Sequence, residues 1–251
     1  MSAETTVLDL ARLRKSCGQC SLQQLCLPAG ISGEELERLD ELVKKRRPLE
    51  RGDRLFRSGS ALSALFVART GSFKTVAMNE DGDEQIIGFH LPGELIGLDA
   101  LGSGSHRCEA EALEGAEVCE IPMNELERVA QQVPGLQHQL LRIIGKSMEL
   151  DQDHLGMLGR RHAAERVLLF IHGLSERLRS LGRPHDQFSL PMSREEIASY
   201  LGLVIETVSR SFTKLQEDGV ISIRGRQLKI LDSKRLSDAA HAPEQLRAAG
   251  R

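Results

Sequence analysis

The chain has 251 residues, of which 40% are hydrophobic, 27% charged and 3% aromatic, and its formal net charge is −3. This length is enough for two compact domains. The first residues hold no long apolar run of the kind found in a secretory signal peptide, and no stretch approaches the length of a membrane span. We therefore expect a cytoplasmic protein.

The charge is unevenly distributed along the chain. Residues 1–158 hold 17 basic and 25 acidic side chains, a net of −8, whereas residues 159–235 hold 14 and 9, a net of +5. An acidic front part and a basic back part predict a body joined to a nucleic-acid-binding module.

Three of the five cysteines, Cys17, Cys20 and Cys26, follow one another with the spacing C-x2-C-x5-C. Cytosolic thiols stay reduced, so an odd number of cysteines favours metal or catalytic chemistry over a disulfide framework. The segment predicts a metal site that lacks a fourth ligand, and the candidates for that ligand are Cys119 or Cys108, with His90 or His106 as substitutes. Structural zinc sites usually pair two short knuckles, so one remote ligand favours an iron–sulfur cluster, with zinc and unliganded thiols as alternatives.

Short apolar runs and turn residues alternate from about Pro48 to Pro122, after a short amphipathic helix that begins near Ser32. Runs this short, with turn residues such as Asp81-Gly82 and Pro92-Gly93 between them, predict an antiparallel β-roll or barrel. The segment from Asn79 to Asp83 predicts the tip of a hairpin.

A long helix is predicted from about Leu136 to Arg161, and five of its positions step by 4, 3, 4 and 3 residues. These positions are Ile144, Met148, Asp151, Leu155 and Leu158. This spacing is typical of a helix that pairs with a copy of itself, and the alternative is a helix packed on its own domain. In a parallel pair two Asp151 carboxylates oppose each other and weaken association. We interpret Asp151 as a switch that makes dimerisation conditional; the alternative is a solvated carboxylate at the edge of the seam.

The basic part predicts a winged helix-turn-helix. Ser193 and Glu196 form a capping box before a short helix, Gly202 interrupts that helix, and a second helix runs to Asp218. By helical spacing, the exposed face of the second helix holds Glu206, Ser209, Arg210 and Thr213. Arginine donates two hydrogen bonds to guanine and glutamate accepts from cytosine, so this face predicts base reading rather than a solvated charge pair. Arg224 and Arg226, at the tip of a following hairpin, are expected to contact phosphates.

These patterns predict an α+β protein with five segments. The segments are an N-terminal cysteine clip (1–30), a β-roll sensor domain (31–134), a dimerisation helix (135–163), a winged helix-turn-helix DNA-binding domain (164–235) and a polar tail (236–251). The sequence offers no nucleophile–base pair, phosphate-binding loop or group of convergent carboxylates, so we do not expect an enzyme.

Taken together, these motifs resemble the FNR-type oxygen-responsive transcription regulators of the CRP/FNR family. The resemblance covers nearly the whole chain and rests on the cysteine clip and on residues 82–86, 118–122, 150–153 and 205–210. It implies a cyclic-nucleotide-binding-like β-roll, a long dimerisation helix and a C-terminal winged helix-turn-helix. It also implies an activator, sometimes a repressor, of genes for anaerobic metabolism.

The resemblance further implies roles for individual residues. A 4Fe-4S cluster on Cys17, Cys20, Cys26 and Cys119 would favour the DNA-binding homodimer, oxygen would convert or destroy it, and Asp151 would keep the cluster-free subunits apart. Glu206, Ser209 and Arg210 would read a TTGAT-type inverted repeat, and Gly82 and Asp83 would contact RNA polymerase.

Two features depart from this pattern. Cys108 is an additional cysteine, expected within a strand of the roll. Gly93-Glu94-Leu95 followed by Arg107 is similar to the phosphate-binding cassette of the cyclic-nucleotide branch, although Cys108 rather than Ser follows the arginine. A cyclic-nucleotide-responsive regulator and a zinc-stabilised regulator therefore remain as alternatives.

Overall fold

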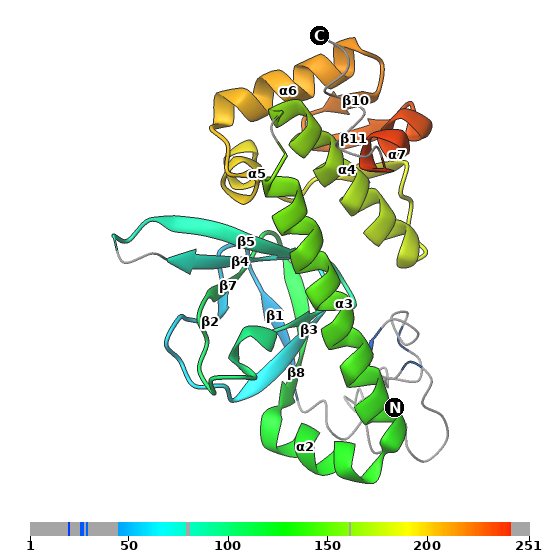
Figure 1. Cartoon of the computed structure of the whole chain (residues 1–251). Helices are drawn as coiled ribbons and strands as arrows, with labels where there is room; N and C mark the ends of the chain where they lie inside the picture. The colour runs from blue at the N-terminus through cyan, green and yellow to red at the C-terminus, as the bar shows by residue number, and fades with distance from the viewer. Residues whose placement is uncertain are drawn as a thin grey trace, which may run out of the picture.

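The computed structural model describes residues 20, 26–27, 29, 45–78, 81–160 and 162–241. A β-roll and a second, mainly helical part are connected by one long helix (Figure 1). The roll consists of β1 (Lys45–Leu49), β2 (Arg54–Phe56), β3 (Ala64–Thr70), β4 (Phe73–Met78), β5 (Glu84–His90), β6 (Leu95–Ile96), the 3₁₀ turn η3 (Leu98–Ala100), β7 (Glu109–Ala112) and β8 (Ala116–Pro122). The rest consists of α2 (Met123–Gln132), α3 (Pro134–Leu158), α4 (Ala163–Ser180), β9 (Gln187–Ser189), α5 (Arg194–Leu201), α6 (Ile205–Glu217), β10 (Ile221–Arg224), β11 (Gln227–Ile230) and α7 (Ser233–His241).

The roll is built from two four-stranded antiparallel sheets, with strand orders β1-β8-β3-β6 and β2-β7-β4-β5. Side chains along a strand alternate between its two faces. Phe66 and Ala68 of β3 therefore belong to the cluster inside the roll, whereas Leu65 and Val67 pack with α2 and the start of α3 on the outer face. Both faces are apolar, which explains why β3 reads as a continuous hydrophobic run.

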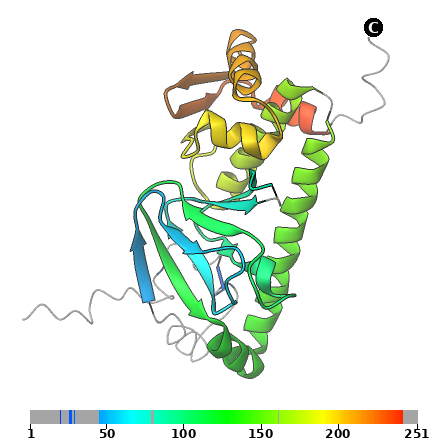
Figure 2. The ribbon, with the colours of Figure 1, turned by 90° about the vertical axis from the view of Figure 1, so that its left-hand side faces the viewer.

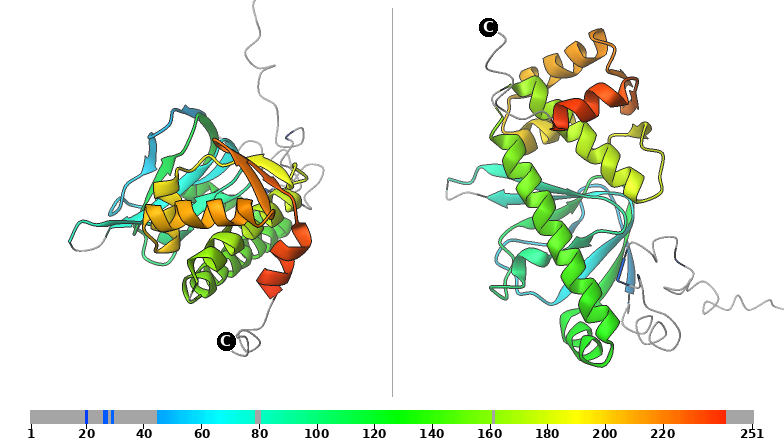
Figure 3. Two further views of the ribbon diagram at one scale, coloured as in Figure 1. Left: turned by 90° about the horizontal axis from the view of Figure 1, so that it is seen from above. Right: turned by 45° about the vertical axis from the view of Figure 1, so that its right-hand side comes forward.

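Helix α3 has 25 residues and begins at Pro134, a residue suited to the first helical turn. At a rise of about 1.5 Å per residue it is about 37 Å long, and it runs along the side of the roll to the helical part (Figures 2 and 3). Its inner face buries Leu136, Gln139 and Met157. Its helical conformation ends at Leu158, three residues earlier than the sequence predicted.

The second part contains a three-stranded sheet of order β10-β11-β9 and the helices α4 to α7. The capping box of α5 is formed: the Glu196 N–H donates to Ser193 Oγ over 3.1 Å, and the Ser193 N–H donates to Glu196 Oε2 over 2.6 Å. The guanidinium of Arg194 stacks 3.7 Å from the ring centre of Phe212, which joins α5 to α6. This is the winged helix-turn-helix arrangement that the sequence predicted.

The prediction of a polar tail from residue 236 onward is wrong for residues 236–241. The segment from Ser233 to His241 is helix α7, and Leu236 is buried in the core of the second part. The carboxylate of Asp232 accepts a hydrogen bond from the Arg235 N–H, so this helix, like α5, has a side-chain cap at its N-terminus. A single buried leucine among polar residues gave too weak a period for a helix to be predicted.

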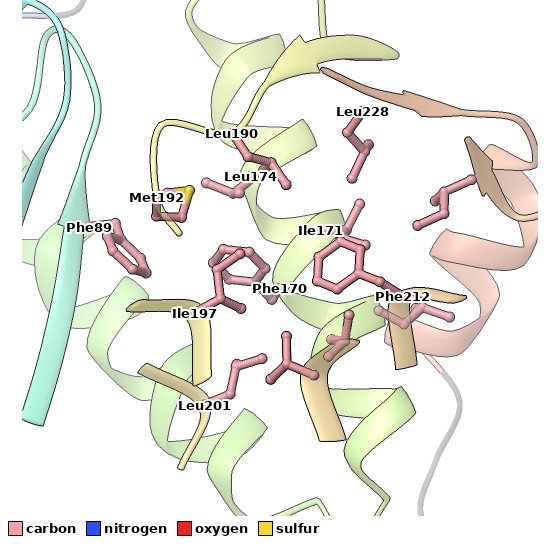
Figure 4. Close-up of a cluster of buried hydrophobic side chains, with 14 of the residues drawn as sticks. Phe89, Phe170, Ile171, Leu174, Leu190, Met192, Ile197, Leu201, Phe212 and Leu228 are labelled. Atoms are coloured by element: carbon pink, nitrogen blue, oxygen red, sulfur yellow. The ribbon is translucent and has the colours of Figure 1, made fainter. Parts of the chain in front are cut away.

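The roll and the second part share one hydrophobic cluster. Phe89 of β5 points toward Phe170, Met192 and Ile197 (Figure 4). Phe89 lies 6.1 Å from Phe170 and 4.9 Å from Tyr200, measured between ring centres. The two parts are therefore packed together rather than joined only by a linker. Within the described part of the chain, no helix combines the length and the apolar character needed to cross a membrane.

Candidate functional site

The predicted base-reading residues lie on one exposed face of α6. Glu206, Ser209, Arg210 and Thr213 are exposed, whereas Val208, Phe212 and Leu215 on the opposite face are buried in the core of the second part. The Thr213 hydroxyl donates to the Ser209 carbonyl over 3.1 Å. Helix α6 lies at the end of the molecule opposite α2 (Figure 1). This face is accessible to a large ligand such as duplex DNA.

Two residues at the start of α6 were not singled out from the sequence. Val204 and Ile205 are 63% and 42% exposed, although both are large and apolar. Val204 is the N-cap and provides no side-chain cap, so N–H groups of the first turn have no side-chain acceptor. Exposed methyl groups suit the thymine methyl group and free N–H groups suit phosphate. The sequence signal that could have identified these two residues is the run of three apolar residues, 203–205, directly before a helix with a polar face.

The predicted wing is the β10–β11 hairpin. Arg224 and Arg226 are exposed on either side of Gly225, whose φ of +60° lies in the left-handed region that favours glycine. The N–H of Leu190 donates to the Arg226 carbonyl over 2.8 Å, which fixes the backbone of the tip while the arginine side chains stay exposed. The wing and α6 belong to the same folded unit.

The predicted seam of α3 includes strongly exposed apolar side chains. Met148 is 57% and Leu155 69% exposed, and Ile144 and Leu158 are half-buried. Leu141, which was not included in the predicted seam, is 64% exposed and lies one heptad before Met148. Its spacing of seven residues from Met148 is the sequence signal that would have extended the predicted seam to Leu141. Asp151 lies between these positions and is exposed. The part of its carboxyl environment that is shielded from water raises its pKa, and the nearby His154 acts in the opposite direction.

The candidate metal ligands are only partly described. Cys17 lies outside the described residues, whereas Cys20, Cys26 and Cys119 are half-buried. Cys119 and Cys26 pack against the same hydrophobic cluster on the outer face of β3 and β8. Among the described residues, no three His, Cys, Asp or Glu side chains are close enough together to hold a metal ion.

Cys108 has a different environment from Cys119. It lies just before β7, not within a strand as expected, and it is buried in the cluster inside the roll. Burial, together with the nearby Asp99, raises the pKa of the Cys108 thiol to about 12. A thiol is a good metal ligand only as the thiolate. Of the two candidates for the fourth ligand, Cys119 is therefore the better placed.

The cysteine clip contacts both the roll and α3. The buried side chain of Gln139, on α3, donates to the Cys26 carbonyl over 3.0 Å. Leu27 is 2% exposed and packs in the cluster that contains Val67 and Ile121. This segment is therefore attached to the long helix at a position two residues before Leu141.

A second contact to the clip comes from Arg69, at the end of β3. Its guanidinium hydrogen-bonds to the Glu117 carboxylate and to the Cys20 thiol. Burial acts to lower the pKa of Arg69, but the interactions with Glu117 and Cys20 outweigh it and raise that pKa. A positive charge is therefore held beside one of the candidate metal ligands.

The predicted polymerase-contact residues lie at the β4–β5 hairpin. Gly82 and Asp83 are exposed just before β5, and Gly82 has a φ of +87°. The hairpin projects beyond the rest of the roll (Figure 1). At its base, the Ile86 N–H donates to Ser199 Oγ of α5 over 2.9 Å. The hairpin is thus attached to the first helix of the helix-turn-helix.

The turn that is similar to a phosphate-binding cassette, residues 93–95, already has a protein partner. Glu94 pairs with Arg177 of α4, and both line a cavity of about 480 Å³ between the roll, α3 and α4. Burial lowers the pKa of the neighbouring His90 to about 4, so this imidazole is neutral at neutral pH. In this turn the Arg177 charge is therefore paired with the Glu94 carboxylate, and the neighbouring His90 ring carries no charge to attract a phosphate.

Comparisons with known proteins agree with this geometry. Residues 46–133 match the family model of the cyclic nucleotide-binding domain, and residues 165–239 match that of the Crp-like helix-turn-helix domain. The solved structure of FixK2 from Bradyrhizobium japonicum matches with a TM-score of 0.72 and 30% identity, covering 79% of this chain and 98% of that chain.

Curated relatives match over most of their length. The transcriptional activator protein Anr of Pseudomonas aeruginosa is 44% identical over 86% of this chain and 89% of that protein. The fumarate and nitrate reduction regulatory protein of Escherichia coli is 38% identical over 89% of this chain and 90% of that protein. The chain therefore belongs to the CRP/FNR family of DNA-binding transcription regulators, in the branch that contains Anr and Fnr.

Proposed function

We propose that this chain is an oxygen-sensing regulator that activates, and at some promoters represses, genes for anaerobic metabolism in the cytoplasm. The observation that carries the proposal is the hydrogen bond from Gln139 of α3 to the Cys26 carbonyl. It connects the cysteine clip directly to the helix that holds the seam. A change of ligation in the clip therefore has a short physical route to the surface that controls association.

The proposed sensor is a 4Fe-4S cluster on Cys17, Cys20, Cys26 and Cys119. The donor chemistry fits, because thiolates are the usual ligands of such clusters. Cys26 and Cys119 share the outer face of β3 and β8, and Cys20 lies beside Arg69 of that same sheet. When bound, the cluster would supply an oxygen-sensitive link between the clip and the roll.

The proposed response is formation of a homodimer through α3. The exposed side chains of Leu141, Met148 and Leu155 form an apolar stripe that a second copy of α3 would cover. Two Asp151 carboxylates would then approach each other and oppose association. Seam contacts outweigh this repulsion only when the attached clip sets the packing of α3, so the dimer becomes conditional on the sensor.

The dimer would place two α6 helices in successive major grooves, about 34–36 Å apart. Glu206, Ser209 and Arg210 would read the half-sites of a TTGAT-type inverted repeat, with Thr213 at the edge of the same face. Arg224 and Arg226 of the wing would contact phosphates and position the domain without reading sequence. Gly82 and Asp83, on the projecting hairpin, would contact RNA polymerase.

Two alternatives make different predictions about the sensor. A cyclic-nucleotide-responsive regulator needs free polar groups in the cassette, but the Glu94 carboxylate already accepts two hydrogen bonds from Arg177. A zinc-stabilised regulator would use the same thiols but would be colourless and insensitive to oxygen. Metal analysis distinguishes the second alternative from the proposal directly.

The test is anaerobic purification of the full chain, followed by iron and sulfide analysis, a visible spectrum and sedimentation before and after exposure to air. The proposal expects about four irons per chain, a broad visible absorption that bleaches in air, and loss of the dimer. A C119S variant should lose the absorption, whereas a C108S variant should keep it. A colourless wild-type protein that contains zinc or no metal would exclude the iron–sulfur sensor.

A further inference from the structure

The C-terminal end of α5 is held by side chains from α3 and α4. The carbonyl of Tyr200 lies 2.7 Å from Nε2 of His154, on α3. The carbonyls of Leu201 and Gly202 lie 3.0 and 3.5 Å from Nη1 of Arg166, on α4. The last carbonyls of a helix have no partner within the helix, so these side chains supply one.

His154 makes two contacts with the same residue. Its ring stacks on the ring of Tyr200 with 3.8 Å between centres and 7° between planes. A carbonyl oxygen only accepts hydrogen bonds, so Nε2 of His154 carries the hydrogen and donates it. Tyr200 is in turn packed against Phe89 and Phe170, at 4.9 and 5.8 Å between ring centres. His154 thus attaches the end of α5 to α3 in both position and orientation.

The same stretch of α3 that contacts α5 carries the seam. His154 lies three residues after Asp151 and directly before the exposed Leu155. Near the end of α3, Cδ2 of Leu158 lies 3.6 Å from the position that a Cβ atom at Gly202 would occupy. Helix α3 therefore presents one face to a partner subunit and the adjacent face to the turn of the helix-turn-helix.

The turn after α5 leads directly into α6. Only residues 202–204 separate Leu201, the last residue of α5, from Ile205, the first residue of α6. The Arg166 side chain that holds the end of α5 is itself fixed in place. Its Nε donates to the Arg160 carbonyl, in the segment between α3 and α4, over 2.9 Å. A shift or rotation of α3 at His154 would therefore move the start of α6.

We propose that His154 is a positioning residue that fixes the helix-turn-helix on α3, so that α3 sets the orientation of α6 as well as subunit association. The inference rests on the proposed function in assigning base reading to α6 and subunit association to α3. Packing across the seam and docking of α5 are then separate functions of one helix. A substitution at His154 should impair specific DNA binding without impairing the dimer.

The test compares His154→Ala with His138→Ala, which removes an exposed histidine from the same helix. The anaerobic full-length proteins are assayed for the dimer by sedimentation and for affinity to a duplex with the TTGAT inverted repeat and to one with scrambled half-sites. Loss of one hydrogen bond and one stacked ring should weaken specific binding by about fivefold or more in His154→Ala. Binding to the scrambled duplex, the dimer and the visible absorption should match those of His138→Ala.

Hydrogen exchange of the full chain gives a readout that does not depend on DNA or metal. In His154→Ala, amides of residues 199–204 should exchange faster, while those of residues 141–148 stay unchanged. A His154→Phe variant keeps a stacking ring without the donor and should be intermediate in both assays, which covers the case in which the alanine variant folds poorly. Unchanged exchange and unchanged specific affinity, or a dimer that weakens in parallel with affinity, would overturn the inference. Absence of iron in the wild type would refute the proposed sensor but not this contact.

Discussion

Glu94, in the turn after β5, and Arg177, in the last turn of α4, form a bidentate ion pair between the roll and the DNA-binding part. Nε of Arg177 donates to Oε1 of Glu94 over 3.0 Å, and Nη2 donates to Oε2 over 2.6 Å. The same Nη2 also donates to the Phe89 carbonyl over 2.5 Å. The side chains of Arg177 and Glu94 are only 14% and 22% exposed, respectively, so they are largely shielded from solvent. The relative placement of the two parts depends on this pair and on the apolar cluster beside it.

Glu94→Gln should destabilise the chain. It leaves the Arg177 guanidinium shielded without a charged partner, which typically costs about 3 kcal/mol in the free energy of unfolding. Urea unfolding of the variant and the wild type measures this cost. The double variant Glu94→Leu with Arg177→Met should recover much of the loss, since no unpaired charge remains. Additive losses in the double variant would mean that the two side chains act independently.

The same pair predicts a pH dependence of stability. Burial acts to raise the pKa of Glu94, but the charge and hydrogen bonds of Arg177 outweigh it and hold this pKa below its usual value. A carboxyl with a lowered pKa contributes stability above its unfolded-state pKa, and this contribution is lost as the pH falls through the folded-state value. The stability difference between the wild type and Glu94→Gln should therefore shrink below about pH 4.5. A difference that stays constant from pH 7 to pH 3 would contradict this assignment.

Most of the fold could be predicted from the sequence because its patterns are local. The capping box of Ser193 and Glu196, the glycine at position 202 and the heptad steps from Ile144 to Leu158 each lie within a few turns of one helix. The Glu94–Arg177 pair could not be predicted, because 83 residues separate its members and no periodicity relates them. Only the folded chain brings them together.

The choice between Cys119 and Cys108 shows the same limit at the candidate metal site. Cys119 lies within β8 and Cys108 lies just before β7, and each packs against a hydrophobic cluster, so hydrophobicity alone does not distinguish them. The register of β8 against β3 supplies the missing information: it pairs Cys119 with Val67, which packs in the same cluster as Leu27 of the clip. Register is a property of two strands, and a single strand sequence does not contain it.

Asp151→Ala should allow the cluster-free chain to dimerise. Removal of two opposed carboxylates from the seam leaves the apolar side chains of Leu141, Met148 and Leu155 to associate. We expect at least about a tenfold lower dissociation constant for the dimer, measured by sedimentation after the iron has been removed. Asp153→Ala, an exposed neighbour on the same helix, should leave the constant unchanged. An Asp151→Ala chain that stays monomeric without iron would refute the repulsion.

Arg210→Ala should lose discrimination between target sequences. A bidentate contact to guanine is worth about 1–3 kcal/mol against the wrong base, so affinity should fall for the TTGAT repeat and change little for a scrambled duplex. Arg226→Ala, on the wing, should instead weaken binding to both duplexes equally and reduce its salt dependence. Titrations at several salt concentrations separate the two patterns. Equal losses on both duplexes for Arg210→Ala would place this side chain on phosphate.

Arg69→Gln should weaken retention of the proposed cluster. The guanidinium donates toward the Cys20 sulfur, and hydrogen bonds from cationic groups stabilise negative charge on ligand sulfurs. Loss of such a supporting contact typically lowers metal affinity about tenfold or more. Arg69→Gln should therefore lose its visible absorption faster than the wild type when an iron chelator is added anaerobically.

Arg54→Gln is the matched control for this experiment. It removes another arginine–glutamate pair of the roll, Arg54 with Glu109 between β2 and β7. That pair lies in the sheet that does not contain Cys119, so a general effect on the stability of the roll would appear in both variants. An effect through the Cys20 sulfur would appear in Arg69→Gln alone. If both variants release iron at the wild-type rate, the charge of Arg69 serves only its pair with Glu117.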